Sequence, residues 1–227
     1  GGYMATPVAI TVEGANILTR TLMTFAQGVL RAHPFLYKEI EAAQNADRKA
    51  GLDQFDSAFG GHTKFMLRNI AASLLHGLTN GAFASTPNQG PMAGWYRKLH
   101  RYAQAFALTA DWTTVFLGGQ LKRKQKISGR MADILGDLYM MSATLRRFED
   151  EGRLAEDREL VDAIMADRIA SMEQTFGEVF ANFPNPVFAW AMRVLCFPLG
   201  RHAQPASDRI NYRFVRSVLQ PGAFRDR

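Results

Sequence analysis

The sequence predicts an all-α protein, folded as an antiparallel bundle of seven or eight helices. Apolar residues recur at spacings of three and four along most of the chain, and no strict alternation lasts long enough to predict a strand. Glycine and proline separate the helical stretches, so most connections are expected to be short. The three longest expected helices, over residues 95–117, 127–150 and 157–183, would form the spine of the bundle.

The N-terminal segment is expected to change from extended chain to helix. Pro7 disfavours helical backbone in the residue before it, so residues 6–12 are expected to be extended or irregular. A helix with a broad apolar face is then expected from position 13 or 14 onward. The His33-Pro34 pair should break or kink this helix, because proline removes a backbone hydrogen bond, and residues 35–46 should continue as helix.

Glycine pairs and prolines set the expected ends of the later helices. Gly60-Gly61 is expected to separate a short helix over residues 53–59 from a longer one over residues 63–78. Residues 79–94 hold three glycines and two prolines and should form an exposed loop. Gly118-Gly119, Gly152, Pro184, Pro198 and Pro221-Gly222 separate or end the remaining helices, over residues 95–117, 127–150, 157–183, 187–196 and 205–219.

The composition is that of an ordinary folded protein whose charge favours anionic partners. Of 227 residues, 47% are hydrophobic and 21% charged, and 27 Lys and Arg against 21 Asp and Glu give a net charge of +6. No uninterrupted run of ~18 apolar residues is present, which argues against a membrane-spanning helix. Cys196 stands alone between apolar neighbours, the setting of an inert buried thiol. A cytoplasmic protein is therefore expected.

The densest basic run is Lys122-Arg123-Lys124-Gln125-Lys126. No aromatic residues alternate with it, and no glycine-rich phosphate-binding loop precedes it. A solvated helix end is therefore favoured over nucleic-acid binding.

The histidines offer no metal-binding pattern along the chain. They are scattered and form no His-Glu-x-x-His or Glu-x-x-His pair, so each is expected to be structural or at the surface, and no metal site is expected. The five are His33, His62, His76, His100 and His202.

The segment Ile10-Thr11-Val12-Glu13-Gly14-Ala15-Asn16 places a carboxylate at an expected helix start. Apolar neighbours would desolvate the Glu13 carboxylate and make it a stronger base. Gly14 would let another molecule approach the backbone, and free N–H groups at the helix start could hold an anion or a carbonyl oxygen. Arg20 follows two turns later on the same face. Alternatively, Glu13 is only a first-turn acid favoured by the helix dipole, and the residues alone leave both interpretations open.

Residues 7–20, Pro7-Val8-Ala9-Ile10-Thr11-Val12-Glu13-Gly14-Ala15-Asn16-Ile17-Leu18-Thr19-Arg20, resemble the segment that carries the catalytic base in the acyl-CoA dehydrogenase family. The likeness is strongest to the long bacterial fatty-acid members. The family pattern is an aromatic residue, Glu, Gly, then Thr or Ser, with Arg seven residues after the Glu; Glu13, Gly14 and Arg20 match it. Val12 replaces the aromatic residue, Ala15 the hydroxyl residue, and Ile17 a Gln that contacts the dinucleotide in many relatives. Further similar stretches are residues 25–34, 117–123, 138–139, 150–153, 182–185 and 197–202, so the resemblance covers nearly the whole chain.

The resemblance implies an FAD-dependent enzyme that converts fatty acyl-CoA to trans-2-enoyl-CoA in fatty acid β-oxidation. Glu13 would remove the α-proton while the β-hydrogen leaves as hydride to FAD, and the Glu13 backbone N–H would donate to the thioester oxygen. Gly14 would lie beside the cofactor. The reduced flavin would pass its electrons to an electron-transfer flavoprotein. Arg20 could hold a carboxylate or a cofactor phosphate, or form a structural ion pair.

The resemblance also implies two regions. Residues 1–46 would be the end of the core helical domain that carries Glu13. Residues 47–227 would be an additional C-terminal helical bundle that contributes to a homodimer and, in some members, to peripheral attachment at the inner membrane.

Apolar residues in and beside the helix expected at 187–196 would form such a membrane face, next to two arginines. They are Phe188, Trp190, Met192, Leu195 and Phe197, beside Arg193 and Arg201. Because the family's flavin-binding domains would precede residue 1, the piece alone is expected to hold no FAD and to be inactive. The alternative is a helical interaction or membrane-association module with no chemistry of its own.

Overall fold

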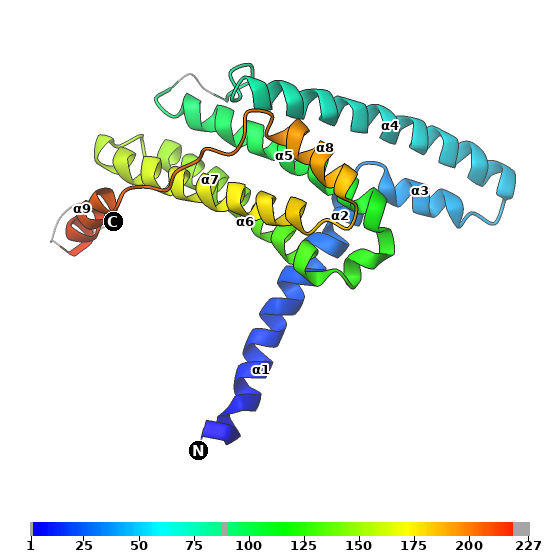
Figure 1. Ribbon diagram of the computed structural model, residues 1–227, viewed down its shortest axis with the longest axis horizontal. Coiled ribbons are helices and arrows are strands. Elements are labelled where there is room, and N and C mark those ends of the chain that lie inside the picture. The colour runs from blue at the N-terminus through cyan, green and yellow to red at the C-terminus, as the bar shows by residue number, and fades with distance from the viewer. Residues whose placement is uncertain (1, 88–89, 220–227) are drawn as a thin grey trace.

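The computed structural model describes residues 2–87 and 90–219, and these form the all-α fold that the sequence predicts (Figure 1). No strand occurs among the described residues. The α-helices are α1 Gly2–Leu18, α2 Gly28–Ala32, α3 Leu36–Ala43, α4 Arg48–Leu78, α5 Ala93–Leu117, α6 Gln125–Asp150, α7 Arg158–Ala181, α8 Pro186–Cys196 and α9 Asp208–Leu219. A π-helix, η1 Thr19–Gln27, follows α1, and the 3-10 helices η2 Gly118–Lys122 and η3 Ala155–Asp157 precede α6 and α7.

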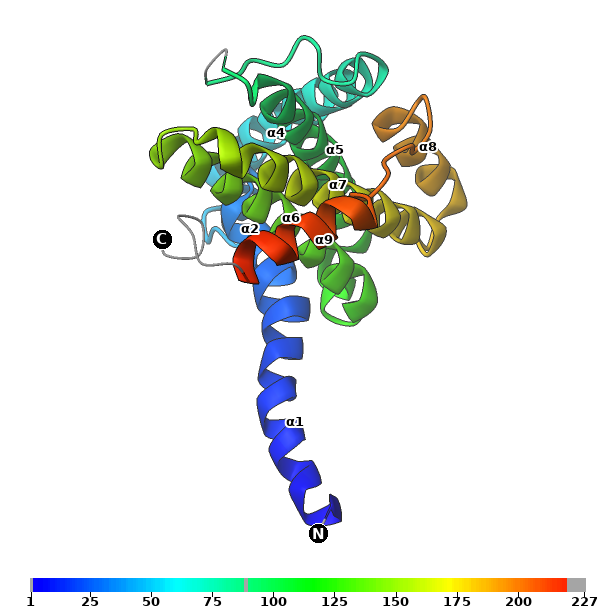
Figure 2. The same ribbon diagram turned by 90° about the vertical axis from the view of Figure 1, so that its left-hand side faces the viewer.

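Helices α5, α6 and α7 pack one against the next and form the centre of the bundle (Figure 1). Helix α4 packs on α5 and also contacts α3, and α8 packs against α4, α5 and α7. Helix α9 contacts α7. Helix α1 projects away from the bundle in both views and joins it through η1, which packs on α6 (Figures 1 and 2). The fold is therefore a bundle with one helix standing clear of it.

The expectation that residues 6–12 are extended or irregular was wrong. Helix α1 runs continuously through Pro7. The residue before a proline is only biased away from helix, and Pro7 lies about one turn into α1, so it removes a single backbone hydrogen bond near the helix start. The helix therefore begins well before position 13.

The expected break at Gly60-Gly61 was also wrong. Helix α4 runs unbroken through both glycines and, at 31 residues, exceeds each of the three helices expected to be longest. A glycine inside a helix costs about 1 kcal/mol relative to alanine, which tertiary packing can offset. The Phe35 ring supplies such packing, because it lies so close to Gly61 that a Cβ there would collide with it.

Local sequence signals explain where several helices begin and end. Helix α2 ends before His33-Pro34 and α3 begins just after it, as predicted. Asp47 caps α4 by accepting hydrogen bonds from the backbone N–H groups of Lys49 and Ala50. Asn185 caps α8 in the same way, and Pro186 follows it at the first helical position, where its missing N–H costs nothing.

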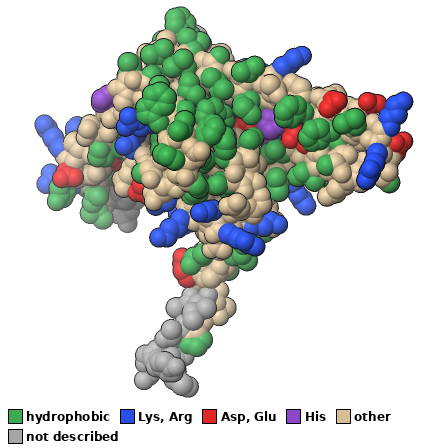
Figure 3. Space-filling model, turned by 45° about the vertical axis from the view of Figure 1, so that its right-hand side comes forward, with side chains coloured by type: hydrophobic (Ala, Val, Ile, Leu, Met, Phe, Trp, Pro, Cys, Tyr) green, Lys and Arg blue, Asp and Glu red, His purple; other side chains and the backbone are tan. Residues whose placement is uncertain are grey.

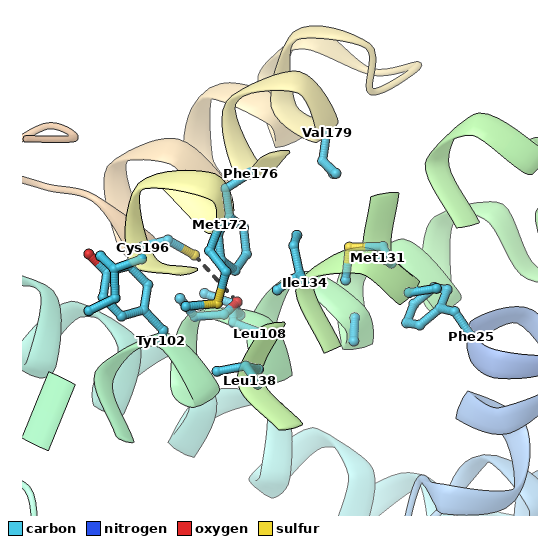
Figure 4. Close-up of a cluster of buried hydrophobic side chains, with 14 of the residues drawn as sticks. Phe25, Tyr102, Leu108, Met131, Ile134, Leu138, Met172, Phe176, Val179 and Cys196 are labelled. Carbon is cyan, nitrogen blue, oxygen red and sulfur yellow. Dashed lines mark hydrogen bonds between the residues drawn. The ribbon is translucent and has the colours of Figure 1, made fainter. Parts of the chain in front are cut away.

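The hydrophobic core lies between α5, α6, α7 and α8 (Figure 4). Phe25 of η1 adds the largest side chain from the N-terminal segment and points toward Met131. The core contains many methionines, which fill irregular spaces between helices. The largest fully buried side chains besides Phe25 are Phe176, Met92, Leu108, Met131, Ile134, Met141, Leu145, Met165, Met172, Met192 and Val179.

The basic run lies at the surface, as predicted. Residues 122–126 are all exposed where η2 leads into α6, so they form a solvated helix end. A separate finding concerns membranes: among the described residues, no helix combines the length and apolar character needed to cross a bilayer.

Candidate functional site

Glu13 lies on the exposed surface of α1, clear of the bundle. The Asn16 side-chain amide donates a hydrogen bond of 3.3 Å to Glu13 Oε2. The expectation that Glu13 stands at a helix start was wrong, because α1 begins at Gly2. In the interior of an α-helix the backbone N–H donates to the carbonyl four residues earlier. The free N–H groups expected beside Glu13 are therefore not found there.

The surroundings of Glu13 are open. Each of residues 11–20 is exposed, and so are the neighbouring apolar side chains of Val8 and Val12, at 64% and 61%. Apart from the adjoining backbone of α1 itself, no atom lies within 4 Å of the position that a Cβ on Gly14 would occupy, so this side of the helix is open to close approach. The described residues around Glu13 thus present an exposed carboxylate on an accessible helix surface.

Arg20 is engaged in a structural ion pair with Asp133 of α6. Arg20 Nε donates to Asp133 Oδ1 over 2.6 Å, and Arg20 Nη2 donates to Asp133 Oδ2. The guanidinium lies over Gly129, where a Cβ would be 2.8 Å from Nη1. The hydrogen bond to Asp133 raises the pKa of Arg20 above its ordinary value despite partial burial. Of the roles left open for Arg20, the structure therefore shows the ion pair.

Two of the scattered histidines meet in the fold. His33, at the end of α2, and His62 of α4 lie beside Asp111 of α5, with their ring nitrogens and carboxylate oxygen within 4.8 Å of one another. Glu39 of α3 contacts the other side of His62. No local pattern predicts this group, because its members lie far apart along the chain and only the packing of α3 on α4 and of α4 on α5 brings them together.

The apolar face expected around α8 is not arranged as predicted. Met192 and Phe197 are buried, at 0% and 4% exposed, because α8 packs into the bundle, whereas Trp190 is 61% exposed. The exposed apolar residues of α8 are instead Val187, Trp190 and Val194, which share one face at helical spacing. Figure 3 shows hydrophobic side chains gathered on one face of the bundle, away from projecting α1.

The fold defines an all-α helical domain of a bundle type, and comparison with known families places it more closely. Residues 30–227 match the family described as acyl-CoA dehydrogenase, C-terminal, bacterial type. The chain belongs to this family. The match begins after Glu13 and Gly14, so it covers the bundle and not the carboxylate on α1. No solved structure matches the chain.

Proposed function

We propose that this chain forms the C-terminal part of an FAD-dependent acyl-CoA dehydrogenase that oxidises fatty acyl-CoA in β-oxidation. The observation that carries the proposal is the family match over residues 30–227, which implies an oxidoreductase. The chain joins that matched bundle directly, through η1, to a helix that holds an exposed carboxylate. The fatty acyl-CoA substrate, FAD, an electron-transfer flavoprotein as electron acceptor and a homodimer are parts of the proposal.

The step proposed for this chain is proton transfer at the Glu13 carboxylate. The carboxylate would take the α-proton of the thioester and become a carboxylic acid. An apolar wall against the exposed side of α1 would desolvate Glu13 and strengthen it as a base. The hydride-transfer part of the reaction belongs, in this proposal, to FAD held by the rest of the enzyme. The Glu13 N–H is not included as a donor, because it lies inside α1.

The test is a pair of substitutions in the full-length enzyme. Glu13→Gln should lower turnover by several orders of magnitude while circular dichroism and the melting temperature stay unchanged, because the amide cannot accept the proton. Glu41→Gln removes another exposed carboxylate, on α3, and serves as the matched control. Turnover of the Glu13→Gln enzyme near the level of the control would contradict the role of Glu13.

A second measurement tests the dependence on the rest of the enzyme. The 227-residue chain by itself should bind no FAD and show no dehydrogenase activity. Yellow protein with activity from this chain would overturn the proposal that the flavin is held elsewhere.

The surface of α8 supports a second candidate function, association with an anionic membrane. Val187, Trp190 and Val194 share its exposed face, and Arg193 lies beside them, also exposed. Trp190→Glu combined with Val194→Glu should abolish flotation with vesicles that contain anionic lipid. Tyr139→Glu, at an exposed position of α6, is the control. Equal flotation of all variants, or of none, would remove this candidate.

A further inference from the structure

A buried histidine in this fold lies between two carboxylates from different helices. His62 Nδ1 is 2.8 Å from Glu39 Oε1, and His62 Nε2 is 2.8 Å from Asp111 Oδ1. The His62 side chain is 5% exposed, that of Asp111 1% and that of Glu39 15%. An ionised carboxylate only accepts hydrogen bonds, so each of the two contacts requires a proton on the ring nitrogen. The geometry therefore describes His62 as an imidazolium that links α3 to α5 through α4.

His33 lies beside the same group of side chains, which we call the array: Glu39, His62, Asp111 and His33. Its Nδ1 accepts hydrogen bonds from the backbone N–H groups of Phe35 and Leu36, at 3.3 and 3.1 Å. Neutral histidine then carries its proton on Nε2, which lies 3.5 Å from Asp111 Oδ1. His33 Nε2 thus lies near the carboxylate that His62 already contacts, but it forms no hydrogen bond to it.

The same tautomer argues against a metal ion. His33, His62 and Asp111 are residue types that bind divalent cations, and their atoms are close enough. A metal at His33 Nε2 would need the lone pair of that nitrogen and would move the proton to Nδ1, which faces two backbone N–H donors. At His62 both nitrogens already face hydrogen-bond acceptors at hydrogen-bonding distance. The array is therefore suited to protons.

The protonation state of His62 decides whether both neighbouring carboxylates keep a hydrogen-bond donor. The titratable groups that face one another here are Glu39 of α3, His62 of α4, Asp111 of α5 and His33 before α3. Lys38 Nζ lies over the Phe35 ring, 5.8 Å from the ring centroid. A neutral His62 has one N–H and could serve only one of the two carboxylates, which would leave the other buried charge without its partner.

Aromatic packing attaches this array to the segment that leads to α1. The Phe35 ring stacks on His62 with centroids 6.1 Å apart, and Phe65 of α4 meets His33 edge-on at 5.3 Å. Phe35 and His33 belong to the turn between α2 and α3, and α2 follows directly from η1. A change at His62 would therefore act on residues 28–43, which connect the bundle to η1 and α1.

We propose that Glu39, His62, Asp111 and His33 form a proton-held clasp, closed while His62 is an imidazolium, which fastens residues 28–43 to α4 and α5 and opens when His62 loses its proton. Opening would loosen the base from which α1 projects, so the placement of α1 would depend on pH. The proposal does not require Glu13 to be a catalytic base.

The pH dependence has a definite sign. Burial lowers the pKa of His62, but the hydrogen bonds to Asp111 and Glu39 outweigh this effect, so the pKa in the folded chain is raised above 6.5. The stability that His62 contributes is fully present below the unfolded pKa and is lost as pH rises through the raised folded pKa. The clasp is therefore closed under mildly acidic conditions and opens toward alkaline pH.

Two measurements on the 227-residue chain test the clasp. Nitrogen-15 NMR of labelled histidine should show protons on both ring nitrogens of His62 above its ordinary titration range, and His33 as the Nε2–H tautomer. Urea unfolding should show that the equilibrium constant for unfolding increases between about pH 6 and about pH 9. The total increase should be about tenfold for each unit by which folding raises the His62 pKa. His62→Gln should abolish that rise.

His76→Gln is the matched control, because His76 is another buried histidine of α4. Burial and the nearby His100 lower the pKa of His76, so His76 makes the chain more stable as pH rises, the opposite of His62. Replacing His76 should therefore leave the loss of folding stability at alkaline pH in place. A neutral His62 ring at pH 6.5, or an unchanged pH dependence in His62→Gln, would overturn the clasp. The clasp would also be overturned if one equivalent of zinc chloride displaced the His62 ring proton and raised the stability of the chain. Should His62→Gln fail to fold, the NMR titration of the unaltered chain decides the question.

Discussion

Arg20 and Asp133, 113 positions apart in the sequence, form a two-point ion pair that fastens η1 to α6. Residues 11–18 of α1 are exposed, so the attachment of this helix to the bundle depends on η1, where Thr21, Phe25 and Ala26 are buried. The pair stands at the junction between the helix that carries Glu13 and the bundle. It thereby links the candidate base to the part of the chain that establishes the family.

Removing the Arg20–Asp133 pair should cost little global stability. Both side chains are partly exposed, at 49% and 40%, so Asp133→Asn should lower the free energy of unfolding by about 0.5–1 kcal/mol. Urea denaturation measures the change. Asp150→Asn, which breaks the more exposed Arg146–Asp150 pair within α6, is the control and should cost less. A larger loss for the control would show that the η1–α6 pair has no special role.

The hydrogen bond between Tyr102 and Glu173 should matter more, because it is buried. Tyr102 Oη donates to Glu173 Oε1 over 2.6 Å, and the two residues are 3% and 5% exposed. Burial raises the pKa of Tyr102 far above its ordinary value, so the phenol stays a donor at alkaline pH. Tyr102→Phe should cost about 2 kcal/mol of unfolding free energy by leaving a buried carboxylate short of a donor.

The comparison for Tyr102→Phe is Tyr139→Phe, since Tyr139 is 72% exposed and should lose almost nothing. Equal melting temperatures of the two variants would mean that the buried hydrogen bond adds no net stability.

Neighbouring positions on α6 should differ sharply in their sensitivity to truncation. Ile134 is fully buried in the core, whereas Leu135 is 36% exposed. Ile134→Ala should destabilise the chain by about 2–5 kcal/mol through lost burial and the cavity left behind, and Leu135→Ala by under about 1 kcal/mol. Chemical denaturation of both variants checks the difference. Similar losses would contradict the orientation of α6 in the bundle.

The Cys196 thiol should be unreactive in the folded chain. It is fully buried, and burial raises its pKa to about 11, although Ser73 and Thr109 lie within hydrogen-bonding distance of the sulfur. A thiol reagent should therefore label the native chain slowly and the urea-unfolded chain fast. Rapid labelling of the native chain near neutral pH would contradict the burial of Cys196.

Local pattern predicted much of the fold, and its errors arose where local pattern and packing disagreed. The periodicity of apolar residues gave the helical class, and His33-Pro34 gave the break between α2 and α3. Gly60-Gly61 misled because helix propensity is a weak local preference that contacts with Phe35 and the rest of the bundle override. Residues 6–12 misled in the same way, since the effect of Pro7 is confined to its immediate neighbours.

In the candidate site, too, local sequence predicted some features and packing between helices decided others. The resemblance in residues 7–20 singled out Glu13 as the candidate base, and this stays a proposal because the family match starts later, at residue 30. The sequence pattern could not show that Arg20 forms an ion pair with Asp133, because that pairing depends on how η1 lies against α6. Nor could it show which side of α8 faces outward, because its apolar residues surround much of the helix and contacts with α4, α5 and α7 decide which are covered.

The amino-acid order by itself determined the helical class and the buried setting of Cys196, because periodicity and apolar neighbours act over a few residues. Only the tertiary structure decided that His33, His62 and Asp111 share one buried array, because contacts between residues 29 to 78 positions apart leave no local signature. A histidine between two carboxylates also has its protonation set by partners from other helices, and those partners exist together only after α3, α4 and α5 have packed.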